Sequence, residues 1–390
     1  MIFILLVCLP ASSPASTRDP GAVRVRALTL DGRKLAGVVR EWRLSGDLTI
    51  ETSAGKTVRV PTSEVDRIDF AAGAKIGPTG TWVIESAGGT RLAGEIVGGD
   101  DRSITINHAL LKEVEMPIER LVRISRRTRD ARVRRSRDGS EDTAILANGD
   151  SVSGVMARVT GQSVVFSDGA GEREIRLDVL EEVIIADTNR TDKAGLRALI
   201  ELRDGAELMA EELFWKGGSL EATLPGGQRL KIDPGDLSYV EVAGGRRDWL
   251  GAMRPVSYEF TPYFGRSWPY RVDANVTGGP LVLRGRTYRR GIGLHSACRI
   301  SWDLAGRYTR FSASAGIDDS GGRYADADLI VRVDGREVQR FKGLRVGAGP
   351  RAINLSIENA KTLTIEVEFG LRGDVQDRVN LVDAALFRKQ

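Results

Sequence analysis

Residues 287–296, TYRRGIGLHS, are the part of this chain whose residue types and spacing most suggest chemistry. Two glycines stand one residue apart and are followed by His295, one of only 2 histidines. A dinucleotide-binding loop needs GxGxxG between a strand and a helix, and Ser296 stands where that pattern needs its third glycine. Alternating apolar runs, which predict strands, follow in place of a helix. The pattern therefore excludes a nucleotide loop.

A catalytic role for His295 needs a nucleophile or a second acid–base group placed beside it by the fold. Ser296 is adjacent in sequence, and consecutive side chains of a strand point to opposite faces, so a Ser–His dyad is excluded. The chain has too few histidines and cysteines for a histidine-rich metal site or a disulfide framework. His295 is expected to bridge a strand and a loop, with ligand contact as the alternative.

Composition places the chain among globular proteins, with 41% hydrophobic and 28% charged residues and a net charge of +4. Its 45 glycines, without a collagen-like period, predict many turns and an all-β fold. So small a net charge does not indicate a nucleic-acid partner. Arginines crowd residues 123–137 and could contact an anionic polymer. Because no aromatic residues are interleaved with them, residues 126–141 are predicted to be a basic linker.

Residues 1–16 have the outline of a signal peptide: an apolar run from Ile2 to Leu9, a break at Pro10, and then small residues. This run is too short to span a bilayer, and no other segment is long and apolar enough to be a transmembrane helix. The protein is therefore predicted to be extracytoplasmic or secreted.

Residues 23–244 contain a four-fold repeat. Each unit has a turn glycine followed three residues later by a hydrophobic residue and five later by Gly or Ala, as in DGRKLAG, GGTRLAG, NGDSVSG and DGAELMA. Each ends with an apolar i, i+3 pair, about 31 to 33 residues after the turn glycine. These pairs are Val65 and Ile68, Leu121 and Ile124, Leu180 and Val183, and Leu237 and Val240. The predicted units are residues 23–70, 80–125, 142–187 and 196–244.

Inside each unit, apolar and polar residues alternate in short runs between tight turns, which predicts antiparallel strands and hairpins. The endings VPTSEVDRI and MPIERLVRI favour a tight helical turn that feeds a last strand. The units resemble small SH3- or Sm-like barrels. Trp42, Trp82 and Trp215 are interpreted as lying at unrelated positions, so no aromatic pair repeats among the units. A scaffold role is predicted for them.

After these units, about seven or eight alternating apolar runs predict a β-sandwich over residues 250–390. The motifs TYRRGIGLHS, RISWDLAGRYTRFSASAGIDD, VRVDG and DVQDRVNLVDAAL occur there in order. On these motifs, residues 256–388 resemble the NPCBM domain, a carbohydrate-binding module first noted beside glycoside hydrolase family 98 catalytic domains. The resemblance implies a galactose-binding-like jelly roll. The family's closing motif usually carries His and Trp where this chain has Arg378 and Leu381. If those two residues help to hold a sugar, this departure argues against sugar binding by this chain.

The resemblance implies a sugar site, in which aromatic faces contact pyranose rings and polar groups bind hydroxyls. The candidate ligand-binding residues are Trp268, Tyr270, Tyr288, His295, Asp318 and Asp319, with Tyr263, Arg266 and Arg271 as further candidates. Core or loop packing is the alternative for each aromatic, and turn formation for the two aspartates. No metal or cofactor is required. Related sandwiches often hold calcium, so the aspartates are also candidate calcium ligands.

Two functions remain open. The first is an exported, non-catalytic glycan-binding protein, with the sandwich as binder and the repeats as scaffold. The second is an envelope or extracellular protein-interaction module without sugar binding. An enzyme is not expected, because the repeats and the sandwich leave no segment for a catalytic domain.

Overall fold

The computed structural model describes residues 23–71, 73–127, 141–169, 171–186, 195–263, 265 and 267–389. The predicted signal peptide and most of the predicted basic linker lie outside these residues. Every regular element in the described part is a β-strand or a three-residue 3-10 helix, which confirms the predicted all-β class. No helix among these residues is long and apolar enough to cross a membrane.

The repeats fold into four modules, numbered in chain order. Module 1 comprises β1 (Arg24–Thr29), β2 (Lys34–Arg43), β3 (Asp47–Thr52), β4 (Thr57–Pro61), η1 (Thr62–Glu64) and β5 (Val65–Phe70). Module 2 comprises β6 (Trp82–Ser86), β7 (Arg91–Gly99), β8 (Ser103–His108), β9 (Lys112–Pro117), η2 (Ile118–Arg120) and β10 (Leu121–Arg126). Module 3 comprises β11 (Asp142–Leu146), β12 (Ser151–Val159), β13 (Ser163–Asp168), β14 (Gly171–Arg176) and β15 (Leu180–Ile184). Module 4 comprises β16 (Arg197–Leu202), β17 (Glu207–Ala210), β18 (Glu212–Lys216), β19 (Ser219–Thr223), β20 (Arg229–Ile232), η3 (Pro234–Asp236) and β21 (Leu237–Ala243).

The first three modules share one antiparallel strand order. In module 1 this order is β5–β1–β2–β3–β4, and modules 2 and 3 repeat it with their own strands. In module 4 the long second strand is split into β17 and β18. The 3-10 helices η1 and η2 confirm the tight helical turn predicted before the last strand. The likeness to SH3- or Sm-like barrels stays a prediction.

The second glycine of the repeat motif lies where two strands come unusually close. A Cβ atom on Gly37, Gly94 or Gly154 would come within 2.2, 2.6 or 2.8 Å of a carbonyl oxygen of the neighbouring third strand. Module 4 has Ala210 at this position, and there its second strand ends. Glycine is therefore required for steric reasons at this position of the motif in the modules whose second strand is continuous.

Replacing Gly94 with alanine is expected to lower the free energy of unfolding of the modules by about 1–3 kcal/mol, because the new methyl group meets backbone that cannot move aside cheaply. Gly98 of the same strand is a matched control, since its added Cβ would find no atom closer than 3.9 Å. Denaturant titration of both variants measures the difference. Equal stability of Gly94→Ala and Gly98→Ala would contradict the steric account.

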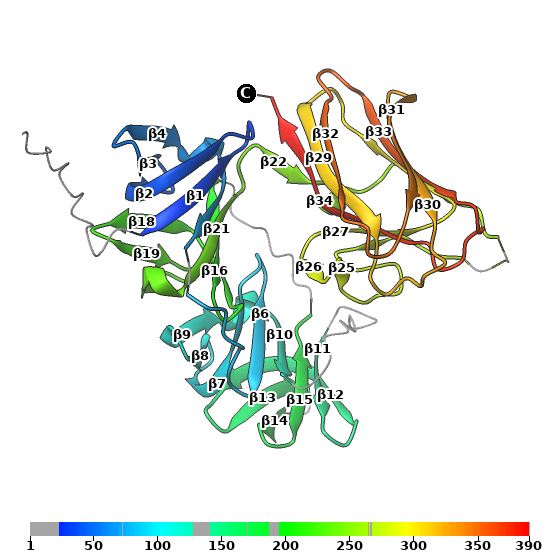
Figure 1. Ribbon diagram of the computed structural model, residues 1–390. Coiled ribbons are helices and arrows are strands. Elements are labelled where there is room, and N and C mark those ends of the chain that lie inside the picture. The colour runs from blue at the N-terminus through cyan, green and yellow to red at the C-terminus, as the bar shows by residue number, and fades with distance from the viewer. Residues whose placement is uncertain are drawn as a thin grey trace, which may run out of the picture.

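The modules associate in two pairs, module 1 with module 4 and module 2 with module 3. Strand β5 pairs with β21 through Ile68 opposite Val240, and β10 pairs with β15 through Ile124 opposite Val183. These residues are the second members of the repeated apolar pairs. Because equivalent positions face each other in antiparallel strands, each pair has a local two-fold axis. Figure 1 shows modules 1 and 4 beside β22, and modules 2 and 3 below modules 1 and 4.

The interpretation that Trp42 and Trp215 lie at unrelated positions is wrong. Each stands ten residues after the turn glycine of its module, Gly32 or Gly205. The two tryptophans are partners across β2 and β18, and both are fully buried. In the other module pair, the equivalent residues are Gly99 and Val159, and a Cβ on Gly99 would lie 2.9 Å from the Val159 carbonyl oxygen.

A buried histidine links module 2 to module 4. His108 Nε2 lies 3.1 Å from Asp204 Oδ2, and both side chains are almost fully buried. His108 Nδ1 accepts hydrogen bonds from the Leu110 and Leu111 backbone N–H groups, so Nε2 carries the proton donated to Asp204. Burial alone would raise the pKa of Asp204, but hydrogen bonds from His108 and the Ala206 N–H lower it overall. Both ring nitrogens are used, so this pair joins modules and offers no free base.

The described arginines of the basic run also hold the fold together. Arg123 pairs with Glu182 of module 3 at 2.5 Å, deep in the interface of modules 2 and 3. Arg126 donates to the Leu180 carbonyl of the same module, and Arg127 to the Gly80 carbonyl. Arg123 and Arg126 are therefore part of the packing between modules, Arg127 is exposed, and residues 128–140 lie outside the described part.

The sandwich consists of two main antiparallel sheets and a small hairpin. The first sheet has the order β24 (Arg271–Val272), β27 (Gly291–His295), β34 (Arg378–Arg388), β29 (Tyr308–Ile317) and β32 (Arg351–Ser356), with β22 (Arg247–Trp249) also on β34. The second has the order β23 (Ser257–Phe260), β28 (Cys298–Asp303), β33 (Thr362–Phe369), β30 (Ala327–Val333) and β31 (Arg336–Leu344). The hairpin is β25 (Leu281–Leu283) with β26 (Arg286–Tyr288), and η4 (Leu250–Ala252) follows β22.

The side chains between the two main sheets form a separate apolar core. Trp302, Phe311 and Leu381 are among its fully buried members. Free Cys298 belongs to the same core, and burial raises the pKa of its thiol to about 12. This thiol is therefore protonated and unreactive at neutral pH.

Arginines connect the sandwich to the modules. Arg247 donates to Asp66 of module 1 and to Glu241 of module 4. Arg289 lies 2.6 Å from Glu207 Oε1, where burial raises the pKa of Glu207 to about 7 against the opposing effect of this arginine.

Candidate functional site

A cavity of about 370 Å³ opens on the sandwich beside the first sheet. Its described lining comes from the segment before β24, from the first residue of β24, from the turn after β24, and from the first residue of β34. The lining residues are Ser267, Trp268, Pro269, Arg271, Val276, Thr277 and Arg378. The cavity thus has an indole wall, two guanidinium groups and two hydroxyls, a combination that could contact a sugar ring and bind its hydroxyl groups.

His295 forms the support of the tryptophan wall. Its ring is parallel to that of Trp268, with ring centroids 4.9 Å apart and an interplanar angle of 5°. Phe260 meets the same imidazole edge-on at 6.5 Å. His295 is 3% exposed, and its Nδ1 donates to the Ser296 carbonyl oxygen at 2.9 Å. This geometry favours a positioning role for His295 beneath Trp268 over direct ligand contact.

Strand pairing explains why Arg378 reaches the same place. In the register of β27 and β34, His295 is directly opposite Arg378. The Arg378 side chain donates from Nη1 to the Ser320 carbonyl oxygen at 2.7 Å. Leu381, the other departure from the family's closing motif, is fully buried opposite Ile292. Leu381 therefore belongs to the core and lies away from the surface where a ligand would bind.

Ser296 does not form a catalytic pair with His295. Its hydroxyl donates to Asp377 Oδ2 at 2.7 Å, and the backbone N–H of Asp326 donates to Asp377 Oδ1 at 2.8 Å. Burial raises the pKa of Asp377 to about 6 against these two hydrogen bonds. The Ser296–Asp377 contact ties β27 to the loop before β34, so its geometry is that of a structural link.

Asp318 is buried, and donors from two loops and from strands β25 and β34 meet at its carboxylate. Its two oxygens accept hydrogen bonds from Asn275 Nδ2 at 3.1 Å, Val282 N at 3.0 Å and Asn380 Nδ2 at 2.5 Å. Ser320 donates from its backbone N–H at 3.0 Å and from its hydroxyl. Five donors occupy the carboxylate, which leaves little room for a ligand.

Asp319, the next residue, holds the turn of the β25–β26 hairpin. Its oxygens accept from the Arg284 N–H at 2.8 Å and the Gly285 N–H at 2.6 Å. Among the residues that the structure describes, no three His, Cys, Asp or Glu side chains are grouped so as to hold a metal ion. Calcium binding at this turn stays a prediction.

The other predicted aromatics lie outside the cavity. Tyr270 meets Tyr258 edge-on at 5.0 Å and packs on the sandwich core. Tyr288 packs on a small cluster of Leu281, Leu283 and Val382. Tyr263 is 54% exposed, and the centroid of its ring lies 5.4 Å from that of the Phe369 ring. Arg266 lies outside the described residues.

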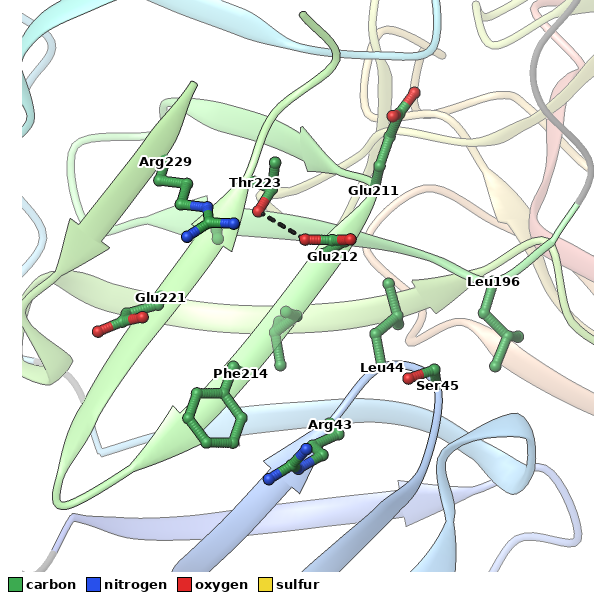
Figure 2. A pocket seen from close by; sticks show the side chains of 12 residues that line it. Arg43, Leu44, Ser45, Leu196, Glu211, Glu212, Phe214, Glu221, Thr223 and Arg229 are labelled. Carbon is green, nitrogen blue, oxygen red and sulfur yellow. Dashed lines mark hydrogen bonds between the residues drawn. The ribbon is translucent and has the colours of Figure 1, made fainter. Parts of the chain in front are cut away.

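A second hollow, of about 610 Å³, lies between modules 1 and 4 (Figure 2), and no motif in the sequence indicated it. Strand β18 pairs with β2 there, and the Arg43 guanidinium lies 4.7 Å from the centroid of the Phe214 ring. Glu212 accepts a hydrogen bond from Thr223 at 3.0 Å. The described lining of this hollow contains both acidic and basic side chains and no tryptophan. The hollow is therefore a poorer match to a sugar than the sandwich cavity.

Residues 247–387 match the NPCBM/NEW2 domain. This confirms the resemblance predicted for the C-terminal third. A curated protein of Renibacterium salmoninarum, named "Putative endo-alpha-N-acetylgalactosaminidase", is 31% identical over 95 residues. The match covers 24% of this chain and 6% of that protein. The chain therefore spans a small part of the length of this relative.

Among solved structures, this chain has CBM51 modules as neighbours. CBM51 from Clostridium perfringens GH95, in complex with methyl-galactose, is 22% identical, and the match covers 36% of this chain and 99% of that chain with a TM-score of 0.33. The tandem CBM51 modules of Sp3GH98, the family 98 glycoside hydrolase of Streptococcus pneumoniae, are 16% identical, covering 79% of this chain and 88% of theirs with a TM-score of 0.33.

Proposed function

We propose that this protein is an exported, non-catalytic glycan-binding protein. In this proposal the sandwich binds a saccharide in the Trp268 cavity, and the four modules form a scaffold that carries it. The observation that supports the proposal most is the cavity itself, which combines an indole, hydroxyls and guanidinium groups within the NPCBM/NEW2 segment. Export is supported by the apolar outline of residues 1–16.

The lining of the cavity also supports a non-catalytic role. Hydrolysis of a glycosidic bond normally requires two carboxyl groups on either side of the bond, about 5–10 Å apart. The described lining contains no Asp or Glu. The nearby carboxylates of Asp318 and Asp377 accept hydrogen bonds from protein groups. A saccharide in this cavity would thus meet hydroxyls, guanidinium groups and an aromatic wall, which suit binding.

A glycan-array screen of the full chain, with Trp268→Ala beside it, tests the proposal. Wild-type protein is expected to bind at least one glycan saturably, and Trp268→Ala should weaken that binding at least about tenfold, as expected for a tryptophan at a binding hot spot. Tyr324→Ala is the control, because Tyr324 is a 46% exposed aromatic residue of the same sandwich outside the cavity lining. Binding that survives Trp268→Ala unchanged would place the ligand elsewhere.

The protein-interaction alternative is favoured by a different observation. Leu371 is 91% exposed and Val375 is 41% exposed, both on the loop between β33 and β34. Exposed apolar side chains on one loop suit a protein contact. A blank array from folded protein would favour this second function.

A further inference from the structure

The Trp268 cavity carries positive charge. Arg271 and Arg378 are the charged residues in its described lining, and no acidic side chain accompanies them there. Arg271 is exposed and Arg378 is half-buried, so solvent reaches part of both residues. A ligand in the cavity therefore meets two cations.

Both guanidinium groups are held in place by neutral acceptors. Arg271 donates from Nε to the Val276 carbonyl oxygen at 3.1 Å, and Arg378 donates from Nη1 to the Ser320 carbonyl oxygen at 2.7 Å. A guanidinium group has five N–H donors, so each arginine keeps donors for a ligand. Because carbonyl oxygens carry no net charge, these contacts orient the two cations without neutralising them.

Other arginines of the sandwich differ in this respect. Arg299 pairs with Glu366 at 2.7 Å, and Arg340 pairs with Glu368 at 2.8 Å. Among the described residues, neither Arg271 nor Arg378 has a carboxylate within ion-pair distance. In the described part of the chain, the cavity thus contains two oriented guanidinium groups that no carboxylate neutralises.

Carboxylates close to the two arginines accept hydrogen bonds from other protein groups. Asp273, two residues after Arg271, accepts from the Gly291 N–H at 3.0 Å. Asp377, which precedes Arg378, accepts from Ser296 and from the Asp326 N–H. Asp318 is 1% exposed and accepts from several protein donors. None of these three carboxylates therefore takes the place of an anionic ligand at the arginines.

We propose that the saccharide bound in the Trp268 cavity carries an anionic group, a carboxylate or a sulfate, that binds Arg271 and Arg378 while its ring contacts the Trp268 wall. This inference rests on the proposed glycan-binding function and names its ligand class. The planar guanidinium fork matches both anions through paired N–H···O hydrogen bonds. The indole wall distinguishes a sugar acid from a small free anion, because it offers contact area to a ring.

The test is a binding titration of the full chain with two sets of probes. The neutral probes are methyl-galactose and N-acetylglucosamine, and the anionic probes are N-acetylneuraminic acid, glucuronic acid and galactose 6-sulfate. At least one anionic probe is expected to bind about tenfold more tightly than the neutral ones, and its affinity should fall as salt rises. Comparison of the carboxylated with the sulfated probes identifies the anion.

Arg271→Gln and Arg378→Gln locate the anion. Each should weaken binding of the anionic probe about tenfold and leave neutral probes within about twofold. Arg336→Gln, at the start of β31 and outside the cavity lining, removes the same charge and should have no effect. Arg271 is exposed, so Arg271→Gln stays informative even where Arg378→Gln loses a structural contact.

Each outcome separates the inference from the function on which it rests. Trp268-dependent binding of a neutral sugar without any gain for the anionic probes would overturn the inference and leave the proposed function standing. Anionic binding that neither arginine substitution weakens would also overturn it. Failure of every saccharide to bind would overturn both.

Discussion

Replacing Asp318 with alanine should lower the free energy of unfolding of the sandwich by about 3–5 kcal/mol, because buried donors that lose their acceptor keep their full desolvation cost. Five donors from Asn275, Val282, Ser320 and Asn380 meet at this carboxylate. They come from the loops that precede β25 and β30, from β25 and from β34. Loss of Asp318 would therefore loosen three segments together.

Asp319→Ala is the matched control for this prediction. Asp319 is half-buried and accepts from two backbone N–H groups of one hairpin turn, so its loss should cost about 1 kcal/mol. Calorimetry of the full chain can follow the sandwich transition separately from that of the modules. If the two variants proved equally stable, Asp318 would not be the centre of the loop network.

The second large effect is expected at the buried Arg123–Glu182 pair. Glu182→Ala should destabilise the association of modules 2 and 3 by about 3–5 kcal/mol, because it leaves the Arg123 charge buried without a partner. The two side chains are 5% and 3% exposed, and the contact of 2.5 Å lies beside the β10–β15 pairing. Denaturant titration of the single variants measures the loss.

Two further variants make this prediction specific. The double variant Arg123→Leu with Glu182→Leu should recover most of the stability, because apolar residues of similar volume often replace a buried ion pair without loss. Glu172→Ala removes a half-exposed partner of Arg158 and should cost less than about 1 kcal/mol. A double variant as unstable as Glu182→Ala would mean that the pair itself, and not the stranded charge, stabilises the interface.

Local patterns in the sequence predicted local structure well. The turn glycines, the alternating runs and the apolar pairs predicted hairpins and a closing turn, and these elements are found in the described modules. Such features depend on a few neighbouring residues, which the sequence displays directly. The sandwich also has more strands than predicted, because short segments such as β22 and β24 have too few residues to show a period.

The association of the modules could not be predicted in the same way. Pairing of β5 with β21 joins residues about 170 positions apart, and no local pattern selects that partner over β10 or β15. A signal was nevertheless present, since Trp42 and Trp215 share one position in the repeat and meet in the structure. Aligning the modules on their turn glycines would have shown it.

The candidate site was predicted in part. Sequence reasoning proposed Trp268 and Arg271, which line the cavity, and singled out Arg378 as a departure. It also proposed Asp318 and His295, whose side chains are buried. Residue type suggests sugar contact for all of them. Only the exposure of each side chain tells whether it lines the cavity or lies buried behind the lining. Exposure depends on long-range packing, which this stretch of sequence does not encode by itself.

A crystal structure of the full chain with the strongest glycan from the array would show where the saccharide binds. We expect it in the cavity lined by Trp268, Thr277 and Arg378, with its ring against the indole. A saccharide bound on the modules, or on the sandwich away from Trp268, would contradict this expectation.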